Sequence, residues 1–311
     1  MNIGDPDKPV AVIAGATATG KSALAIAVAQ ALGGVIINAD ATQLYADLRI
    51  LSARPDETDL NAAPHRLYGV IDGADACSAA GWAAMARSEI DAAHGSGRLP
   101  ILVGGTGLYL RTLIDGIAPV PEIDPQIREA VRGLDTMAAR DALLIEDPDA
   151  AARLQPADRQ RSLRALEVVR STGRTLAGWQ AEQVGGIGAT CRIAAVVIDR
   201  EREALRQRCT VRVDEMFARG AVAEVERLLS RRLPADSPVL RAIGMPPIAA
   251  FLAGTLTHAT AVATVAHDTR RYAKRQATWF RNQTSQWPQY NGELTNLNEK
   301  VSEYFTGSFR R

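Results

Sequence analysis

The sequence predicts an α/β protein: a P-loop-type parallel sheet core flanked by helices, with an inserted small all-helical domain. In the first 118 residues, continuous apolar runs alternate with helix-like segments, as in a parallel sheet covered on both faces. A glycine-rich loop follows the first apolar run. Residues 119–189 contain no clear strand and are typical of short amphipathic helices. We therefore expect a core of residues 1–118 and 190–311, and an insert whose helices are broken at Pro125, Pro148 and Pro156.

Each core element has its own local signals. The apolar run Val10–Ala14 predicts the first strand, and Ser22–Leu32 is rich in Ala and Leu, which favour a helix that Gly33 ends. Ser78 is a typical helix N-cap. The other predicted elements are strands in "VIIN" (35–38), "LPILVGGTG" (99–107) and "CRIAAVVID" (191–199), and helices over Ser78–Ala93, Glu201–Arg219, Ala221–Ser230 and Ala259–Asn282.

Composition excludes several classes of protein. The chain has 311 residues and a net charge of +1, with acidic residues in excess before residue 120 and basic residues in excess after it. No apolar run reaches the roughly 18–20 residues of a transmembrane helix, and the N-terminus has no secretory pattern. The cysteines Cys77, Cys191 and Cys209 are far apart, which predicts neither disulfides nor a zinc site. We expect a cytoplasmic protein, and a monomer because no heptad seam is present.

The stretch "GATATGKS" matches the phosphate-binding pattern G-x-x-x-x-G-K-[ST] between a predicted strand and helix. Its glycines let backbone N–H groups turn inward, Lys21 adds a positive charge, and the Ser22 hydroxyl can ligate Mg²⁺. The pattern predicts a polyphosphate and a magnesium ion, and ATP is its commonest ligand, although nothing in it contacts a base. The predicted phosphate-binding residues are Gly15, Ala16, Thr17, Ala18, Thr19, Gly20, Lys21 and Ser22.

Asp40 follows the second apolar strand, and three interpretations of it remain open on spacing alone. It could ligate magnesium as a Walker-B-like aspartate, it could cap a turn or helix, or it could be a general base. Because Asp40, the phosphate loop and residues 104–107 all follow strands, we expect them to meet at the carboxyl edge of the sheet.

Five blocks in order, taken together, resemble bacterial tRNA dimethylallyltransferases, also called tRNA isopentenyltransferases. They extend from residue 11 to about residue 281 and cover most of the chain. The blocks are "GATATGKS", "DATQLY" with "SARP", "GGTGLYL", "DRQRSLRALEVVRSTGR" and "RRYAKRQATWFR". The resemblance implies transfer of a dimethylallyl group from dimethylallyl diphosphate to N6 of adenosine 37, next to the anticodon of tRNA. Diphosphate would be released, and the target base would flip out of its stack to reach the donor.

The resemblance also implies roles for individual residues. Asp40 would be the general base, and Lys21 and Thr106 would be the other catalytic residues, with Thr106 beside the reacting base. The anticodon stem-loop of tRNA would contact Asp40, Ala41, Thr42 and Gln43, then Thr106, Arg128, Gln160, Arg161, Ser162, Leu163 and Arg164. Spacing itself adds that Gln43 could pair with an adenine edge. It equally allows Gln43, Thr106 and the arginines to be ordinary surface or turn residues.

Arg208 and Arg212 match the family pattern R-x-x-x-R, and one of the two should contact the diphosphate. The sequence does not decide which one. It also departs from the family at Ala16, where proline is usual, and at Ser52 and Arg54, where threonine and lysine are common. The family's usual "IGYKE" appears here as "IGMPPIA".

Three other functions compete with tRNA prenylation. A prenyltransferase acting on free adenine nucleotides would need the phosphate loop and Asp40 but not the basic segments. A P-loop kinase or ATPase would use Asp40 to bind magnesium. A non-catalytic RNA-binding module would leave the polar residues at the strand ends without a purpose.

Overall fold

The computed structural model describes residues 8–292 and 294–309, and it divides the chain into two compact units. The first consists of Met1–Ile114 and Ile187–Arg311, and the second of Asp115–Gly186. These limits lie a few residues before the domain boundaries that the sequence suggested. No helix within the described part of the chain combines the length and hydrophobicity of a membrane span.

The first unit is built on a six-stranded sheet in the order β3-β2-β4-β1-β7-β8, in which every neighbouring pair is parallel. The α/β class predicted from the sequence is confirmed. Because β1 lies between β4 and β7, the loops that follow these three strands meet at one edge of the sheet. The strands are β1 (Pro9–Gly15), β2 (Gly34–Asn38), β3 (His65–Arg66), β4 (Leu99–Gly104), β7 (Arg192–Asp199) and β8 (Gln289–Asn291).

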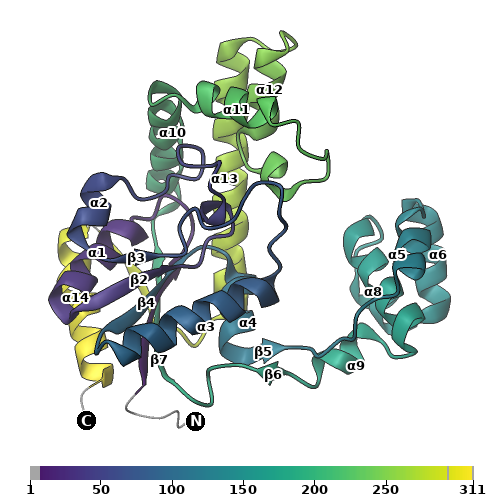
Figure 1. The fold of residues 1–311 in the computed structure, drawn as a ribbon, viewed down its shortest axis with the longest axis horizontal. Coiled ribbons are helices and arrows are strands. Elements are labelled where there is room, and N and C mark those ends of the chain that lie inside the picture. The colour runs from purple at the N-terminus through teal and green to yellow at the C-terminus, as the bar shows by residue number, and fades with distance from the viewer. Residues whose placement is uncertain (1–7, 293, 310–311) are drawn as a thin grey trace. The chain divides into compact units, whose positions relative to one another are not determined.

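Helices cover both faces of this sheet (Figure 1). Ile13 and Val196 point to a core formed with α1 and α14, whereas their strand neighbours Val12 and Val197 point to a core formed with α3, α4 and α13. Burial on both faces explains why the strands are apolar throughout. The helices of this unit are α1 (Lys21–Leu32), α2 (Glu57–Ala62), α3 (Ala79–Gly95), α4 (Gly107–Asp115), α10 (Arg202–Ala218), α11 (Ala221–Ser230), α12 (Met245–Leu252), α13 (His258–Gln283) and α14 (Leu294–Phe309).

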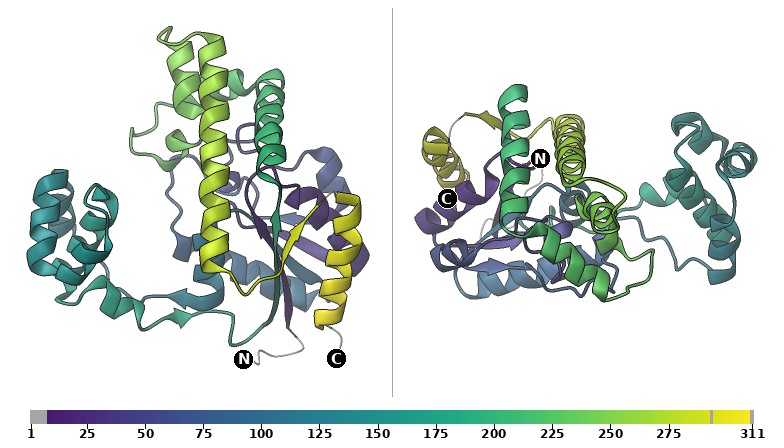
Figure 2. Two further views of the ribbon diagram at one scale, coloured as in Figure 1. Left: turned by 180° about the vertical axis from the view of Figure 1, so that it is seen from behind. Right: turned by 90° about the horizontal axis from the view of Figure 1, so that it is seen from above.

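The long helices α10 and α13 lie side by side (Figure 2) and continue beyond the sheet edge that carries the loops. The limits of both helices agree with the sequence prediction to within a few residues. Glu201 and Thr257 mark where the helices begin, because their side chains accept hydrogen bonds from backbone N–H groups of the first turn. Together with α11 and α12 they form a third apolar core, which includes Val213, Val225 and Ile248. This bundle also packs against the chain that follows β2.

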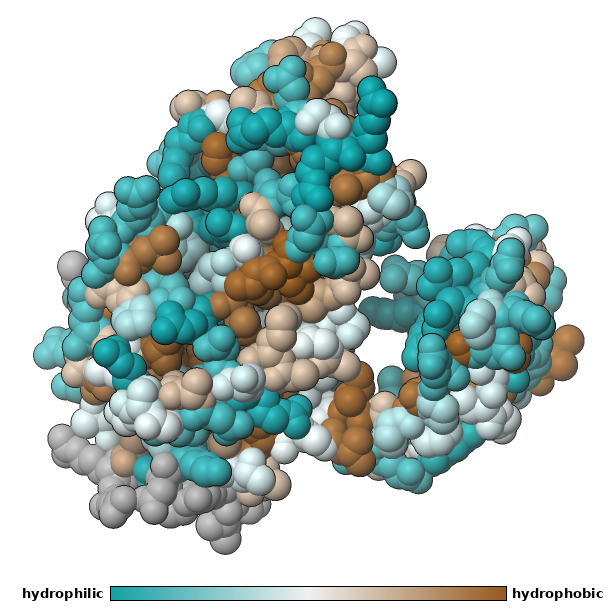
Figure 3. All heavy atoms as spheres, in the orientation of Figure 1, coloured by the Kyte–Doolittle hydropathy of each residue, from teal (hydrophilic) through white to brown (hydrophobic). Residues whose placement is uncertain are grey.

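The second unit is a small helical bundle with its own core of apolar side chains from α5 to α8, such as Leu143 and Leu166. As expected, prolines separate its short helices: α5 and α7 begin at Pro125 and Pro148, where proline is well tolerated, and Pro156 lies between α7 and α8. Figure 3 shows a mainly hydrophilic visible face on this unit. Its elements are β5 (Gly116–Ile117), α5 (Pro125–Arg132), α6 (Thr136–Glu146), α7 (Pro148–Arg153), α8 (Arg159–Thr172), α9 (Leu176–Gln180) and β6 (Val184–Gly185).

Several elements were not expected from the sequence. The strands β5 and β6 pair antiparallel at the two ends of the helical unit, although no strand was predicted within residues 119–189. The helices α2, α12 and α14 and the strand β8 were also missed. Strands of two or three residues give too short a pattern to recognise, and the apolar face of α14 has meaning only once it packs on α1.

Candidate active site

The phosphate loop follows β1 in the conformation that its glycines permit. Gly15 has a φ of +145°, and a Cβ there would lie 2.3 Å from the carbonyl oxygen of Ile198 in β7. Gly20 precedes α1 in the left-handed region, and Ala18 also has a positive φ of 63°. The loop therefore delivers the N-terminus of α1, whose first N–H groups have no acceptor inside the helix, to the carboxyl edge of the sheet.

Lys21 is held inside this loop. Its Nζ donates to the carbonyl oxygen of Ala16 at 2.6 Å. Burial lowers the pKa of Lys21 to about 8; the charge of Asp40 raises this pKa, and the charge of Arg212 lowers it further. Lys21, Asp40 and Arg212 are therefore close enough to act on one another electrostatically, and an added anion would favour the charged form of Lys21.

Asp40 lies in a tight turn after β2. The side chain of Asn38 accepts from the backbone nitrogen of Asp40 at 2.8 Å and donates to its carbonyl oxygen at 3.0 Å. Oδ1 of Asp40 accepts from the backbone nitrogen and the hydroxyl of Thr42, at 3.0 and 2.7 Å. Oδ1 therefore holds the turn, and Asp40 also lines the cavity described below.

Thr106 supports the same turn from the loop after β4. Its Oγ1 accepts from the backbone nitrogen of Ala41 at 3.0 Å, and its own backbone nitrogen donates to Ala39 at 3.2 Å. Tyr272 of α13 is hydrogen-bonded to this hydroxyl. Burial and the charge of Asp40 raise the pKa of Tyr272 well above its usual range, although the hydrogen bond to Thr106 by itself lowers it. Thr106 thus links α13, β4 and the Asp40 turn.

Asp40, Tyr272 and Arg212 line a cavity of about 220 Å³. One part of its wall is polar and carries Thr17, Asp40 and Arg212, while another part is apolar and carries Leu51, Met216 and Val265. The remaining lining residues are Thr42, Ser52, Arg241, Ala242, Ile243, Thr269, Tyr272 and Arg275. A cavity with a cationic, an anionic and an apolar region suits a ligand that joins a phosphate group to a short hydrocarbon.

The structure separates the two arginines that the sequence left equivalent. Arg212 lines the cavity and donates to the carbonyl oxygen of Ser52 at 3.2 Å, and its burial lowers its pKa. Arg208 lies one turn away, is exposed, and donates through Nε to the carbonyl oxygen of Ala18 at 2.7 Å. Arg212 therefore faces the cavity, whereas Arg208 braces the phosphate loop from outside.

Gln43 is tied to the loop that carries Ser52. Its Nε2 donates to the carbonyl oxygens of Ser52 and Ala53, at 3.1 and 3.0 Å. The amide donors are thus occupied inside the protein, and the oxygen is the end left for an adenine. Gln43 and Arg212 share the Ser52 carbonyl, so this one loop orients both side chains.

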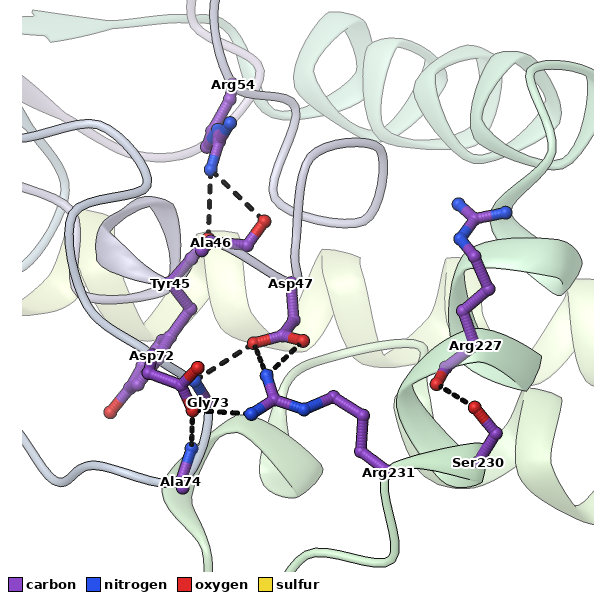
Figure 4. A network of polar contacts seen from close by, with 10 residues as sticks. All are labelled: Tyr45, Ala46, Asp47, Arg54, Asp72, Gly73, Ala74, Arg227, Ser230 and Arg231. Atoms are coloured by element: carbon purple, nitrogen blue, oxygen red, sulfur yellow. Dashed lines mark hydrogen bonds and ion pairs between the residues drawn. The ribbon is translucent and has the colours of Figure 1, made fainter.

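Three carboxylates that the sequence analysis did not identify support these loops. Glu224 of α11 is buried and accepts from the backbone nitrogens of Arg49, Ile50 and Leu51, at 3.0, 2.6 and 3.0 Å. In Figure 4, Arg231 bonds both oxygens of Asp47, at 2.6 and 2.7 Å. Arg231 also bonds Asp72, at 2.6 Å. None of the three belongs to a recognisable motif, because these partners are distant in sequence.

The residues predicted to contact tRNA within the insert divide by burial. Gln160, Arg161 and Arg164 are exposed on α8, and Arg128 is half-buried on α5. The side chains of Ser162 and Leu163 are 1% and 7% exposed, and Leu163 belongs to the core of the helical unit. These two side chains face away from solvent, since they fill the inner face of the same helix.

Comparisons with known proteins show the family of this chain. The IPP transferase family pattern matches residues 43–283, and an isopentenyl transferase pattern matches residues 8–74. A tRNA dimethylallyltransferase of Sphingopyxis alaskensis is 59% identical over 92% of this chain and 94% of its own length. One from Erythrobacter litoralis is 52% identical over 97% and 96%.

Solved structures of tRNA-prenylating enzymes are also similar to this chain. A tRNA isopentenylpyrophosphate transferase of Bacillus halodurans superposes with a TM-score of 0.72 at 29% identity, covering 97% of both chains. A eukaryotic dimethylallyltransferase acting on tRNA superposes with a TM-score of 0.82 at 26% identity. That match covers 95% of this chain and 77% of the other.

Proposed function

The chain belongs to the IPP transferase family and is a prenyltransferase, and we propose that it transfers a dimethylallyl group from dimethylallyl diphosphate to tRNA. The acceptor is N6 of the adenosine next to the anticodon, and diphosphate leaves. The observation that carries this proposal is that Asp40 and Arg212 line one cavity that also has an apolar wall, while Lys21 is close enough to interact with both charges.

The phosphate loop and its cations suit the leaving group. As the bond between carbon and the diphosphate oxygen breaks, negative charge develops on the diphosphate. Backbone N–H groups at the start of α1, together with Lys21 and Arg212, would stabilise that charge. The apolar side chains Leu51, Met216 and Val265 would hold the short prenyl group, directing its reactive carbon toward the polar side of the cavity.

Asp40 is suited to accept the proton that the acceptor loses. The N6 nitrogen forms a bond to the allylic carbon as the carbon–oxygen bond breaks, and one N6 proton passes to the carboxylate. Oδ1 is held by Thr42, which leaves Oδ2 for this transfer. Since Asp40 lines a cavity inside the protein, the adenine would have to leave its stack to reach it.

Magnesium is a suitable companion of the diphosphate, and the residues present fit it. The described residues include no group of three or more His, Cys, Asp or Glu side chains able to enclose a metal ion. Mg²⁺ does not need such a cage, because it is commonly held by one or two protein oxygens, substrate phosphates and water. Ser22, exposed in the first turn of α1, would supply the protein oxygen. When bound, the ion would neutralise charge on the diphosphate.

The exposed cations of α8 would bind the anticodon stem-loop. Arg161 is paired with Asp158 at 3.4 Å and Arg164 with Glu167 at 3.4 Å, and the two arginine side chains are 74% and 44% exposed. An exposed pair such as Arg161–Asp158 exchanges its protein partner for a phosphate at small cost. Glu167 is buried, but it would keep Arg132 as a partner at 3.3 Å if Arg164 turned to a phosphate.

The test is to incubate the protein with undermodified tRNA, labelled dimethylallyl diphosphate and Mg²⁺, with AMP and ATP assays in parallel. Label in tRNA is expected. Label in AMP alone, or ATP hydrolysis alone, would replace the proposal with one of the competing functions.

Asp40→Asn should bind both substrates and lose turnover by about 10²–10⁴-fold, the usual contribution of a general base. Asp91→Asn, an exposed change on α3, is the matched control and should keep full activity. Unreduced turnover in Asp40→Asn would remove the general-base role while leaving the overall reaction intact.

A further inference from the structure

Gln276 is a buried polar side chain that the reaction described above does not use. It lies on α13 and is 5% exposed. Its Oε1 accepts from the backbone nitrogen of Thr17 at 2.8 Å, and its Nε2 donates to the carbonyl oxygen of Gly105 at 2.9 Å. The two ends of one amide therefore bond two different loops, the phosphate loop and the loop after β4.

The contact with Gly105 leaves no room for another side chain. A Cβ at Gly105 would lie 2.1 Å from Nε2 of Gln276, so any larger residue there would displace the Gln276 side chain. Burying an amide costs free energy unless both ends are bonded, and here both ends are. The amide thus holds the two loops at one separation.

Each loop leads directly to a catalytic group. Thr17 belongs to the phosphate loop and lines the cavity together with Arg212, where the diphosphate would bind. Gly105 precedes Thr106, which accepts from the backbone nitrogen of Ala41, the residue after Asp40. A continuous series of short contacts therefore runs from the phosphate loop through Gln276 to the turn that carries the general base.

We propose that Gln276 is a positioning residue that fixes the diphosphate-binding loop relative to the Asp40 turn. It touches neither reacting group. It instead sets the distance between the leaving group and the base, on which the attack of N6 depends. This inference rests on the proposed prenyl transfer.

The polarity of the amide provides a sharp test. In Gln276→Glu, one carboxylate oxygen still accepts from Thr17, but the other faces the carbonyl oxygen of Gly105 and repels it. Protonation restores a donor toward Gly105, and burial raises the pKa of a carboxyl group. The kcat of Gln276→Glu relative to wild type should therefore be lowest near pH 8 and recover as the pH falls toward about 5.5.

The experiment measures kcat and KM for dimethylallyl diphosphate across this pH range, with tRNA as acceptor. We expect kcat of Gln276→Glu at pH 8 to fall by about tenfold or more, as loss of alignment does. Because kcat is measured at saturating donor, it is not lowered by weaker donor binding that results from repulsion between the new charge and the diphosphate. Gln276→Met, which lacks both bonds without adding charge, should show a similar fall in kcat at every pH.

The matched control is Gln283→Glu, which places the same charge on an exposed position of the same helix. Its kcat relative to wild type should not change with pH. A pH-independent ratio for Gln276→Glu, or an unchanged kcat in Gln276→Met, would overturn the positioning role. If a Gln276 variant does not fold, Gly105→Ala perturbs the contact from the other loop and should lower kcat in the same way.

The wild-type reaction separates the two proposals. No transfer to tRNA by the unaltered protein would reject the proposed function. Normal transfer with insensitive variants would reject only the role of Gln276.

Discussion

The Nζ atom of Lys21 lies 2.6 Å from the carbonyl oxygen of Ala16, so the cation of the phosphate loop is satisfied within its own loop. Burial lowers its pKa to about 8. A bound diphosphate would raise this pKa, because it favours the charged form. Binding should therefore take up a proton near and above pH 8, and affinity should weaken as the pH rises through this range.

Calorimetry with dimethylallyl diphosphate from pH 7 to 9.5 checks this prediction. Lys21→Met is the control, because the titration of the ligand itself is common to both proteins. The affinity difference between the two should shrink as the pH rises above about 8. A difference that stays constant over the range would show that Lys21 keeps its proton throughout.

Arg212 and Arg208 should differ when each is replaced by glutamine. Arg212 lines the cavity, so its loss should lower kcat/KM for the prenyl donor by about 10²–10³-fold, comparable to removing one transition-state donor. Arg208 is exposed and bonds only the outside of the phosphate loop, so Arg208→Gln should cost less than about tenfold. Steady-state kinetics give kcat/KM for the two variants. Equal losses of kcat/KM would assign both arginines to the diphosphate.

Glu224 should stabilise the fold through the loop that lines the cavity. In Glu224→Ala, three backbone N–H groups lose their buried acceptor. We expect the free energy of unfolding to fall by about 2–4 kcal/mol, since a single unsatisfied buried group costs about 1–3 kcal/mol. Glu226→Ala, an exposed change on the same helix, is the control and should stay within about 0.5 kcal/mol. Urea denaturation measures the free energy of unfolding of both variants. Similar losses in Glu224→Ala and Glu226→Ala would mean that water replaces the carboxylate of Glu224.

Arg161 and Arg164 should contribute to tRNA binding by neutralising phosphates. Replacing both with glutamine should weaken binding and reduce the slope of log K against log salt by about 0.7–0.9 for each phosphate that is no longer neutralised. Arg98→Gln, an exposed change immediately before β4, lies at the opposite edge of the sheet from the phosphate loop and is the control. Filter binding over a salt series gives the affinity for tRNA and its salt slope. An unchanged slope would leave the two arginines as ordinary surface residues.

The positions of the phosphate loop, Asp40 and Thr106 in the fold are predictable from the sequence. Each follows an apolar strand, and the strands of a parallel sheet bring their carboxyl ends to one edge. Glycines at the required positions, a strand before and a helix after the loop are all local signals. The limits of α10, α11 and α13 are equally predictable, because caps and periodicity act over a few residues.

The remaining parts of the site depend on contacts between distant residues. Arg208 and Arg212 are one turn apart with the same chemistry, and only the path of α10 beside the Ser52 loop places Arg212 in the cavity. Gln276 meets Thr17 across 259 positions, and Glu224 meets Ile50 across 174. Hydrogen bonds between such distant residues leave no spacing pattern in the chain. Sequence alone was enough to predict the family and the loops at the sheet edge, whereas packing of the helices decides which neighbouring side chains line the cavity.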